Sequence, residues 1–165
     1  MNIFKKILVT VVLVLGLSTM SSAKEINDSA ALNGVKETKS VFLIDFTNVK
    51  KTAFYMRIIE GTHKGLLKQG VKPNMVLVFI GQTVKYLSTQ QDEAFEMENE
   101  DNLNSIQTSI QNLNKLGVRM EVCAVATKVF NVKNNTIPKE MNLVADGFIS
   151  LIGWQTQGHK LVPIF

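Results

Sequence analysis

The feature that most constrains the fold of this chain is a pair of short, uninterrupted apolar runs followed by a third, mostly apolar segment. The runs lie at residues 41–44 and 75–80, the third segment lies at residues 118–126, and glycine, proline or polar residues bound all three. A continuous apolar run of this length is typical of a β-strand that is covered on both faces. The pattern therefore predicts the interior of a parallel sheet.

Segments with helical spacing separate these strands. After Thr47 or Asn48, both residues that cap helices, one helical face continues until Gly70. A short helical piece is expected around residues 84–87. A longer helix starts in the acidic stretch 92–101, where carboxylates favour the positive end of the helix dipole, and ends at Gly117. The residues that mark the two long helical faces are Tyr55, Ile59, Thr62, Leu66, Leu103, Ile106, Ile110 and Leu113.

The last third of the chain continues the alternation of strands and helices. Residues 142–146 are expected to form a short strand, residues 148–155 a helix, and residues 159–164 a closing strand. Pro163 has no N–H to donate to a ladder, which predicts that the closing strand lies at a sheet edge or ends at this residue. The whole pattern predicts one compact α/β domain, with a mostly parallel sheet of about five strands and helices on both faces.

The first 23 residues have the pattern of a secretory signal peptide. Two lysines precede an apolar run at residues 7–20, and small residues follow at a cleavage site after Ala23. We therefore expect an exported protein, periplasmic if the source is a Gram-negative bacterium, with a flexible leader at residues 24–39 and the folded domain at residues 40–165. The alternative is an uncleaved anchor, but the run is shorter than the roughly 20 residues that a spanning helix needs. We expect no stable membrane anchor after cleavage.

The charge balance argues against a nucleic-acid partner. The chain has 18 basic and 14 acidic residues, a formal net charge of +4, and the signal segment includes two of the lysines. The basic residues are scattered, without the stripe and interleaved aromatic residues of a nucleic-acid surface. His63, expected on the surface of the first helix, and His159, expected half exposed in a turn, have no further ligands at a metal-site spacing. The sequence indicates neither a metal nor a cofactor.

Cys123 is the only cysteine of the chain and the main candidate for chemistry. Without a second cysteine, the chain forms neither an internal disulfide nor a C-x-x-C redox pair. Cys123 lies in the second half of its strand, and ligands of parallel sheets bind beyond the carboxyl ends of the strands. Lys128 and Lys133, in an expected loop at residues 127–136, are candidates to stabilise a thiolate. The alternative is a buried cysteine that acts as a small apolar side chain.

The cysteine strand and the segments around it resemble the DsrE/DsrF-like family. The resemblance covers "KSVFLIDFTN" and "VKPNMVLVFIGQTVKYL" for the first two strands, "GVRMEVCAVAT" for the strand with the cysteine, and "IPKEMNLVADGFISLIGWQTQGHKLVPI" for the rest. Gln155, Gln157 and Gly158 match a turn before the last strand of the family. Ile80 and Gly81 stand where relatives often have a histidine and a glycine.

This resemblance implies a fold, an assembly and an activity. The fold is a compact α/β sandwich of DsrE type, and the assembly is a homo- or hetero-oligomer. The activity is sulfur relay, in which a cysteine carries sulfur as a persulfide, and the matching residue, Cys123, would be the sulfur acceptor. The expected partners are further copies of this chain and a sulfur donor or acceptor, either a protein or a small sulfane-sulfur compound.

Two other functions fit parts of the sequence. One is a noncatalytic exported oligomer of the same fold, with Cys123 in the core and a crevice that binds a small ligand or nothing. The other is a metal-dependent nuclease of the PIN/NYN type, because "VFLIDFTN" places Asp45 at a strand end and Asp146 follows another strand. Such a nuclease needs several clustered carboxylates to hold a divalent metal. An accessible, reactive thiol distinguishes sulfur transfer from the noncatalytic alternative.

Overall fold

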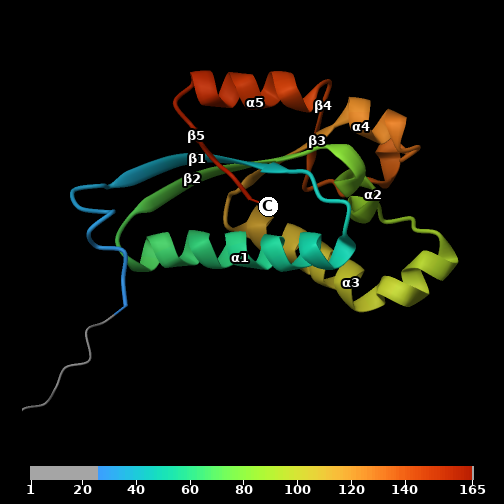
Figure 1. The fold of residues 1–165 in the computed structure, drawn as a ribbon, viewed down its shortest axis with the longest axis horizontal. Coiled ribbons are helices and arrows are strands. Elements are labelled where there is room, and N and C mark those ends of the chain that lie inside the picture. Colours follow the sequence, from blue (N-terminus) through green and yellow to red (C-terminus); the bar gives the residue numbers. More distant parts are fainter. Residues whose placement is uncertain (1–25, 165) are drawn as a thin grey trace, which may run out of the picture.

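A computed structural model of the chain describes residues 26–164 and contains a five-stranded sheet in which every pair of neighbours is parallel (Figure 1). The order across the sheet is β4-β3-β2-β1-β5, which confirms the predicted parallel sheet of about five strands. The expected signal segment and the first two residues of the expected leader lie outside the described residues. The strands are β1 (Glu37–Ile44), β2 (Lys72–Phe79), β3 (Arg119–Cys123), β4 (Asn142–Val144) and β5 (Lys160–Val162).

Helices cover both faces of the sheet, as predicted. Two long helices, α1 and α3, pack side by side on one face, and α5 crosses the opposite face (Figure 1). Two short helices, α2 and α4, follow the carboxyl ends of β2 and β3. The helices are α1 (Val49–Lys68), α2 (Val84–Leu87), α3 (Glu93–Lys115), α4 (Ala124–Val129) and α5 (Gly147–Thr156). No helix within residues 26–164 is long and apolar enough to cross a membrane.

The starts of the two long helices follow capping residues. The side chain of Asn48 caps α1 and accepts a hydrogen bond of 2.8 Å from a backbone N–H of the first turn. The side chain of Asp92 caps α3 in the same way, with an oxygen 3.1 Å from the N atom of Phe95. Glu93 and Glu96 lie in the first turn of α3, where the helix dipole favours negative charge. The acidic stretch is therefore a helix start, as predicted.

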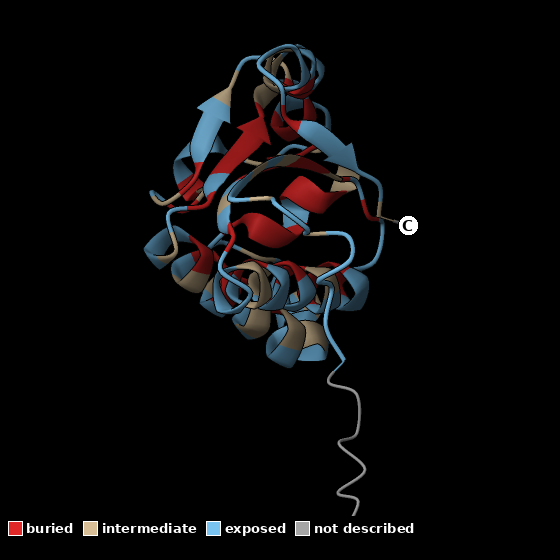
Figure 2. Ribbon diagram, turned by 90° about the vertical axis from the view of Figure 1, so that its left-hand side faces the viewer, coloured by how far each residue is buried: buried red, intermediate tan, exposed pale blue. Residues whose placement is uncertain are grey.

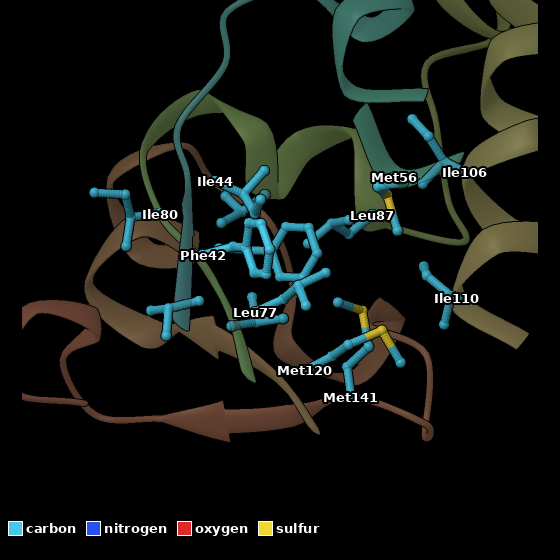
Figure 3. Close-up of a cluster of buried hydrophobic side chains, with 14 of the residues drawn as sticks. Phe42, Ile44, Met56, Leu77, Ile80, Leu87, Ile106, Ile110, Met120 and Met141 are labelled. Atoms are coloured by element: carbon cyan, nitrogen blue, oxygen red, sulfur yellow. The ribbon is translucent and has the colours of Figure 1, made fainter. Parts of the chain in front are cut away.

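The hydrophobic core lies between the sheet and the pair of helices α1 and α3. The central strand β2 is buried over residues 75–79 (Figure 2). Met56 of α1 and Ile110 of α3 reach toward the sheet in this core, where Met120 of β3 also lies (Figure 3). Successive side chains of a strand point to opposite faces, so Glu121 and Cys123 point to the face that α5 covers.

The third strand is shorter than the sequence predicts. A strand is expected over residues 118–126, but β3 ends at Cys123 and α4 begins at Ala124. The partners of β3 explain this end, because Phe79 at the end of β2 pairs with Val122, and Val144 at the end of β4 pairs with Cys123. Without a partner strand further on, the backbone satisfies its hydrogen bonds by forming a helix. The predicted loop 127–136 consists of the end of α4, a turn, and the short 3-10 helix η2 (Asn134–Thr136).

The first two strands begin earlier than the sequence predicts. β1 starts at Glu37, within the expected leader, and pairs from there with Lys72 of β2. Pro73 therefore lies inside a strand rather than in a turn. It is tolerated because β3 pairs with β2 only from Val76 onward, so no N–H at position 73 is needed on that side.

The closing strand lies where its proline predicts. β5 is the edge strand beside β1, and Pro163 follows directly after its last residue, Val162. Its pairing with β1 is limited to three residues, Lys160 to Val162. An edge strand this short presents little unpaired backbone to other chains.

Candidate functional site

Cys123 is the last residue of β3 and lies under the first turn of α5. The backbone N–H of Gly147, the first residue of α5, donates a hydrogen bond to the cysteine sulfur, with 3.2 Å between N and Sγ. Val144, the register partner of Cys123 on β4, leads into this turn. The carboxyl ends of two neighbouring strands and the start of a helix thus meet at one thiol, at the side of the sheet where ligands of parallel α/β folds bind.

The contact between Gly147 and Cys123 requires a glycine. A Cβ atom at position 147 would lie 3.0 Å from Cys123 Cβ and 2.5 Å from Cγ2 of Ile80, the residue after β2. Close packing leaves Cys123 only 5% exposed. The first turn of α5 therefore shields the sulfur from solvent.

The start of α5 gives the surroundings of Cys123 a favourable field for an anion. Asp146 caps the helix, and its Oδ1 accepts a hydrogen bond of 2.8 Å from Phe148 N. The N–H of Gly147 is left to point at the sulfur. The positive end of a helix dipole and a direct N–H donor both stabilise a thiolate relative to a thiol.

The structure shows no contact between Cys123 and the two lysines that the sequence suggests as thiolate-stabilising groups. Lys128 is exposed near the end of α4, and Lys133 is exposed in the turn that follows. Neither side chain forms an ion pair or a hydrogen bond with another described residue. Lys133 lines a cavity of about 450 Å³ together with Lys85, Phe95 and Phe130, and Cys123 is not part of that cavity. The lysines were expected beside the thiol because residues 124–126 were expected to extend the strand, whereas the strand ends at Cys123 and α4 begins at Ala124.

A buried carboxylate, Glu121, lies two residues before the cysteine on the same face of β3. Glu121 is 3% exposed, and it accepts hydrogen bonds from Ser150 Oγ and from Trp154 Nε1, the latter at 3.0 Å. Its other oxygen accepts a hydrogen bond of 2.5 Å from Arg119 Nε, which also forms an ion pair. Burial acts to raise the pKa of the Glu121 carboxyl, but the hydrogen bonds from Ser150, Arg119 and Trp154 outweigh it and hold the pKa below its usual value.

Sequence reasoning missed Glu121, although a signal was present. A glutamate interrupts the apolar strand at an alternating position with Cys123, and Ser150 and Trp154 are spaced four residues apart in a helical segment. Such residues occupy one face of a helix. A buried acid in a strand and polar donors on one face of a neighbouring helix together indicate a strand-to-helix contact.

Both histidines are buried, contrary to the prediction from sequence. His63 lies on the inner face of α1, where burial first and the nearby charge of Lys64 second lower its pKa. His159 is buried beside Trp154, with the two ring centroids 4.9 Å apart, and its Nε2 atom lies 3.3 Å from Asn74 Oδ1. The exposure of each histidine ring depends on tertiary contacts, which the local spacing of residues does not predict.

The two aspartates of the nuclease interpretation have local structural roles. Asp45 is exposed after β1 and lies against Gly81, where a Cβ atom would be 2.0 Å from Asp45 Oδ1. Asp146 caps α5, as described above. Among residues 26–164, no three His, Cys, Asp or Glu side chains lie close enough together to hold a metal ion. The arrangement therefore offers the nuclease interpretation no carboxylate cluster.

A separate apolar groove lies between α1 and the β1–β5 edge of the sheet. Its volume is about 340 Å³, and its walls include Phe42, Tyr55, Ile59, Val162 and Ile164. The size falls within the range of small-molecule pockets, roughly 300–1,000 Å³. The groove lies on the face of the sheet opposite to Cys123.

Solved structures with the same fold include three bacterial or archaeal proteins. Protein MTH1491 from Methanobacterium thermoautotrophicum, described as of unknown function, aligns with a TM-score of 0.55 at 14% identity, over 77% of this chain and 97% of its own. The ychN protein from E. coli also aligns at 0.55 and 14%, over 78% and 99%. Protein BT1422 from Bacteroides thetaiotaomicron, a conserved protein of unknown function, aligns at 0.50 and 18%, over 84% and 100%. At these identities the likeness concerns the fold.

Sequence comparison identifies the family. No curated protein matches the sequence significantly. The sequence profile of the DsrE/DsrF-like family, in contrast, matches residues 21–164, which is most of the chain. The match covers all five strands, the helix α5 and the cysteine at the end of β3. This chain therefore belongs to the DsrE/DsrF-like family.

Proposed function

We propose that this chain is an exported sulfur carrier that holds sulfur as a persulfide on Cys123. The observation that carries the proposal is the hydrogen bond from the Gly147 N–H to Cys123 Sγ at the start of α5. A sulfur carrier needs one nucleophilic thiolate and no second cysteine, and this chain has one cysteine. Membership of the family adds support, because the resemblance in sequence implies a persulfide at this position.

The reaction consists of two sulfur transfers between thiolates. In the first, the Cys123 thiolate attacks the outer sulfur of a donor persulfide, forms Cys–S–S⁻ and releases the donor as a thiolate. In the second, an acceptor thiolate attacks the outer sulfur of Cys–S–S⁻ and restores the Cys123 thiolate. Each step breaks one S–S bond and forms another, so no external oxidant or reductant is required. The start of α5 stabilises the negative charge at both stages.

Mass spectrometry of the protein without residues 1–23 tests this proposal. Incubation with a polysulfide donor should add the mass of one sulfur atom at Cys123, and a thiol acceptor should remove it. The variant Cys123→Ser should take up no sulfur while it keeps the circular dichroism spectrum of the parent. The proposal would be overturned if the parent protein took up no sulfur, or if Cys123→Ser took up as much sulfur as the parent.

Noncatalytic binding of a small apolar ligand is the second candidate function. The apolar groove between α1 and β5 favours it, since a groove of this size accommodates a small molecule. Under this function Cys123 is a packed core residue, in line with its low exposure. A groove variant such as Ile59→Trp should then abolish binding of an apolar fluorescent probe such as anilinonaphthalene sulfonate, whereas Cys123→Ser should retain it.

We further propose that the folded chain forms a homo-oligomer through the outer face of α5. Three large apolar side chains there, Phe148, Ile149 and Ile152, are 59%, 69% and 63% exposed. Apolar surface on this scale is typical of an interaction site, and symmetric self-association covers the same patch on each copy. The first residue of this helix, Gly147, contacts Cys123, so an interface on α5 would adjoin the thiol.

A further inference from the structure

We infer that Glu121 is a positioning residue for Cys123: its carboxylate holds α5 on β3 and thereby keeps the Gly147 N–H on the cysteine sulfur. The inference rests on the proposed function, since it concerns the same thiol. Glu121 does not contact the sulfur. It acts through α5, which receives one contact from Cys123 and two from Glu121.

The spacing of these contacts matches between the strand and the helix. Glu121 and Cys123 are two residues apart on β3 and so share one face. Gly147, Ser150 and Trp154 are three and four residues apart on α5 and also share one face. Two adjacent side chains on the strand thus hold three positions on the helix, from its first residue to its third turn.

Few apolar contacts compete with this polar attachment. Only Gly147 and Leu151 are buried among the residues of α5. Phe148, Ile149 and Ile152 point outward and are exposed. α5 therefore lacks the broad apolar stripe that holds α1 and α3 on the opposite face. A larger share of its attachment falls to the hydrogen bonds with Glu121.

The Glu121 carboxylate is suited to this role because, as a buried charge, it is stable only while it accepts hydrogen bonds. A buried charge without hydrogen bonds is strongly unfavourable, so the donors of α5 are favoured to stay in contact with it. Arg119 supplies the balancing positive charge from the same strand and lies over the Trp154 ring, with 5.7 Å between the guanidinium carbon and the ring centroid. The set of Arg119, Glu121, Ser150 and Trp154 therefore fixes both the position and the rotation of α5.

Removal of the two donors on α5 tests the inference, because it leaves the Glu121 side chain and its ion pair with Arg119 in place. In the double variant Ser150→Ala/Trp154→Phe, hydrogen exchange at the Gly147 amide should become at least about tenfold faster, while amides of β2 keep their rates. Alkylation of Cys123 by iodoacetamide at one fixed pH should become at least about tenfold faster, because a looser helix start uncovers the sulfur. Glu121→Gln should also speed exchange at Gly147.

Matched variants separate positioning from a general loss of stability. Thr156→Ala removes an exposed hydroxyl from the same helix, which bonds only to Ile152 O, and should change neither readout. Ser150→Thr keeps the hydroxyl and leaves Trp154 unchanged, so exchange at the Gly147 amide should stay as slow as in the parent. If the double variant does not fold, the single variant Ser150→Ala should show the same changes at smaller size.

Two results would overturn the inference. One is an unchanged exchange rate at Gly147 in every Ser150, Trp154 and Glu121 variant. The other is faster exchange at all amides alike, with alkylation of Cys123 faster only by that same factor, which is the result of a merely structural role. Failure of sulfur uptake by the parent protein would instead overturn the proposed function, and the exchange rate at Gly147 would still decide whether Glu121 positions α5.

Discussion

Gly147 and Ile80 are in such close contact that a Cβ atom on Gly147 would lie 2.5 Å from Cγ2 of Ile80. The residue after β2 and the first residue of α5 thus close the space above Cys123 from two sides. This contact fixes how near the helix start can come to the thiol. It also leads to the first prediction.

The variant Gly147→Ala should destabilise the fold by about 1–3 kcal/mol, the range for overpacking in a buried site. Its methyl group would meet Ile80 and Cys123, so α5 must shift and lengthen the hydrogen bond to the sulfur. Urea denaturation measures the loss. Gly153→Ala on the same helix is the control, because no atom lies within 4 Å of its added Cβ, and alanine favours a helix interior by up to about 1 kcal/mol. Equal stabilities for the two variants would contradict the prediction.

Glu121 should make the stability of the protein fall in acid. Its pKa is lower in the folded state than in the unfolded chain, where a glutamate titrates near pH 4.3. Its contribution is therefore complete above that pH and is lost as the pH falls through the folded-state pKa. Glu121→Gln should reduce the free energy of unfolding by about 2 kcal/mol at neutral pH. The difference between parent and variant, measured by urea denaturation, should shrink as the pH falls below about 4; a constant difference would contradict the assignment.

The titration of His63 should lower the free energy of unfolding at a higher pH than the titration of Glu121 does. Burial lowers its pKa in the folded state, so the unfolded chain binds the proton first when the pH falls below about 6.5. Stability is complete above this value and decreases as the pH falls toward the folded-state pKa. The variant His63→Leu should remove this part of the pH dependence. Urea denaturation at about pH 7.5 and about pH 5 measures the free energy of unfolding of both proteins. An equal change between the two pH values in parent and variant would contradict the prediction.

Charges on the outer face of α5 should weaken self-association. The double variant Ile149→Lys/Ile152→Lys places like charges on both copies of a symmetric interface, which disfavours their contact. Sedimentation velocity at micromolar concentration should show an oligomer for the parent and a smaller species for the variant. Met97→Lys, at an exposed position of α3, is the control and should not change the assembly. A parent protein that sediments only as a monomer would contradict the proposal.

Much of the fold was predictable because it follows from local patterns. The buried runs of β1 and β2, the caps Asn48 and Asp92, and the edge position of a strand next to Pro163 all have short-range signals in the sequence. The alternation of strand and helix then leaves few arrangements other than a parallel sheet. Family resemblance added the expectation that chemistry would concentrate at Cys123.

The surroundings of Cys123 were less predictable because they depend on distant segments. The end of β3 is set by where β2 and β4 stop, and residues 124–126 fit a strand and a helix equally well. The donor to the thiol and two of the three donors to Glu121 come from α5, more than twenty residues further along the chain. Burial of His63 and His159 has the same origin. The spacing of residues along the sequence does not predict any of these contacts.

The position of β5 has a consequence for how the protein is made. β1 is synthesised early and β5 late, yet they are neighbours in the sheet. Until the ribosome has produced the segments between them, at about 5–20 residues per second, the edge of β1 has no strand to cover it. During those seconds its free N–H and C=O groups are open to a strand of another nascent chain. Docking of β5 therefore protects β1 against strand exchange as well as completing the sheet.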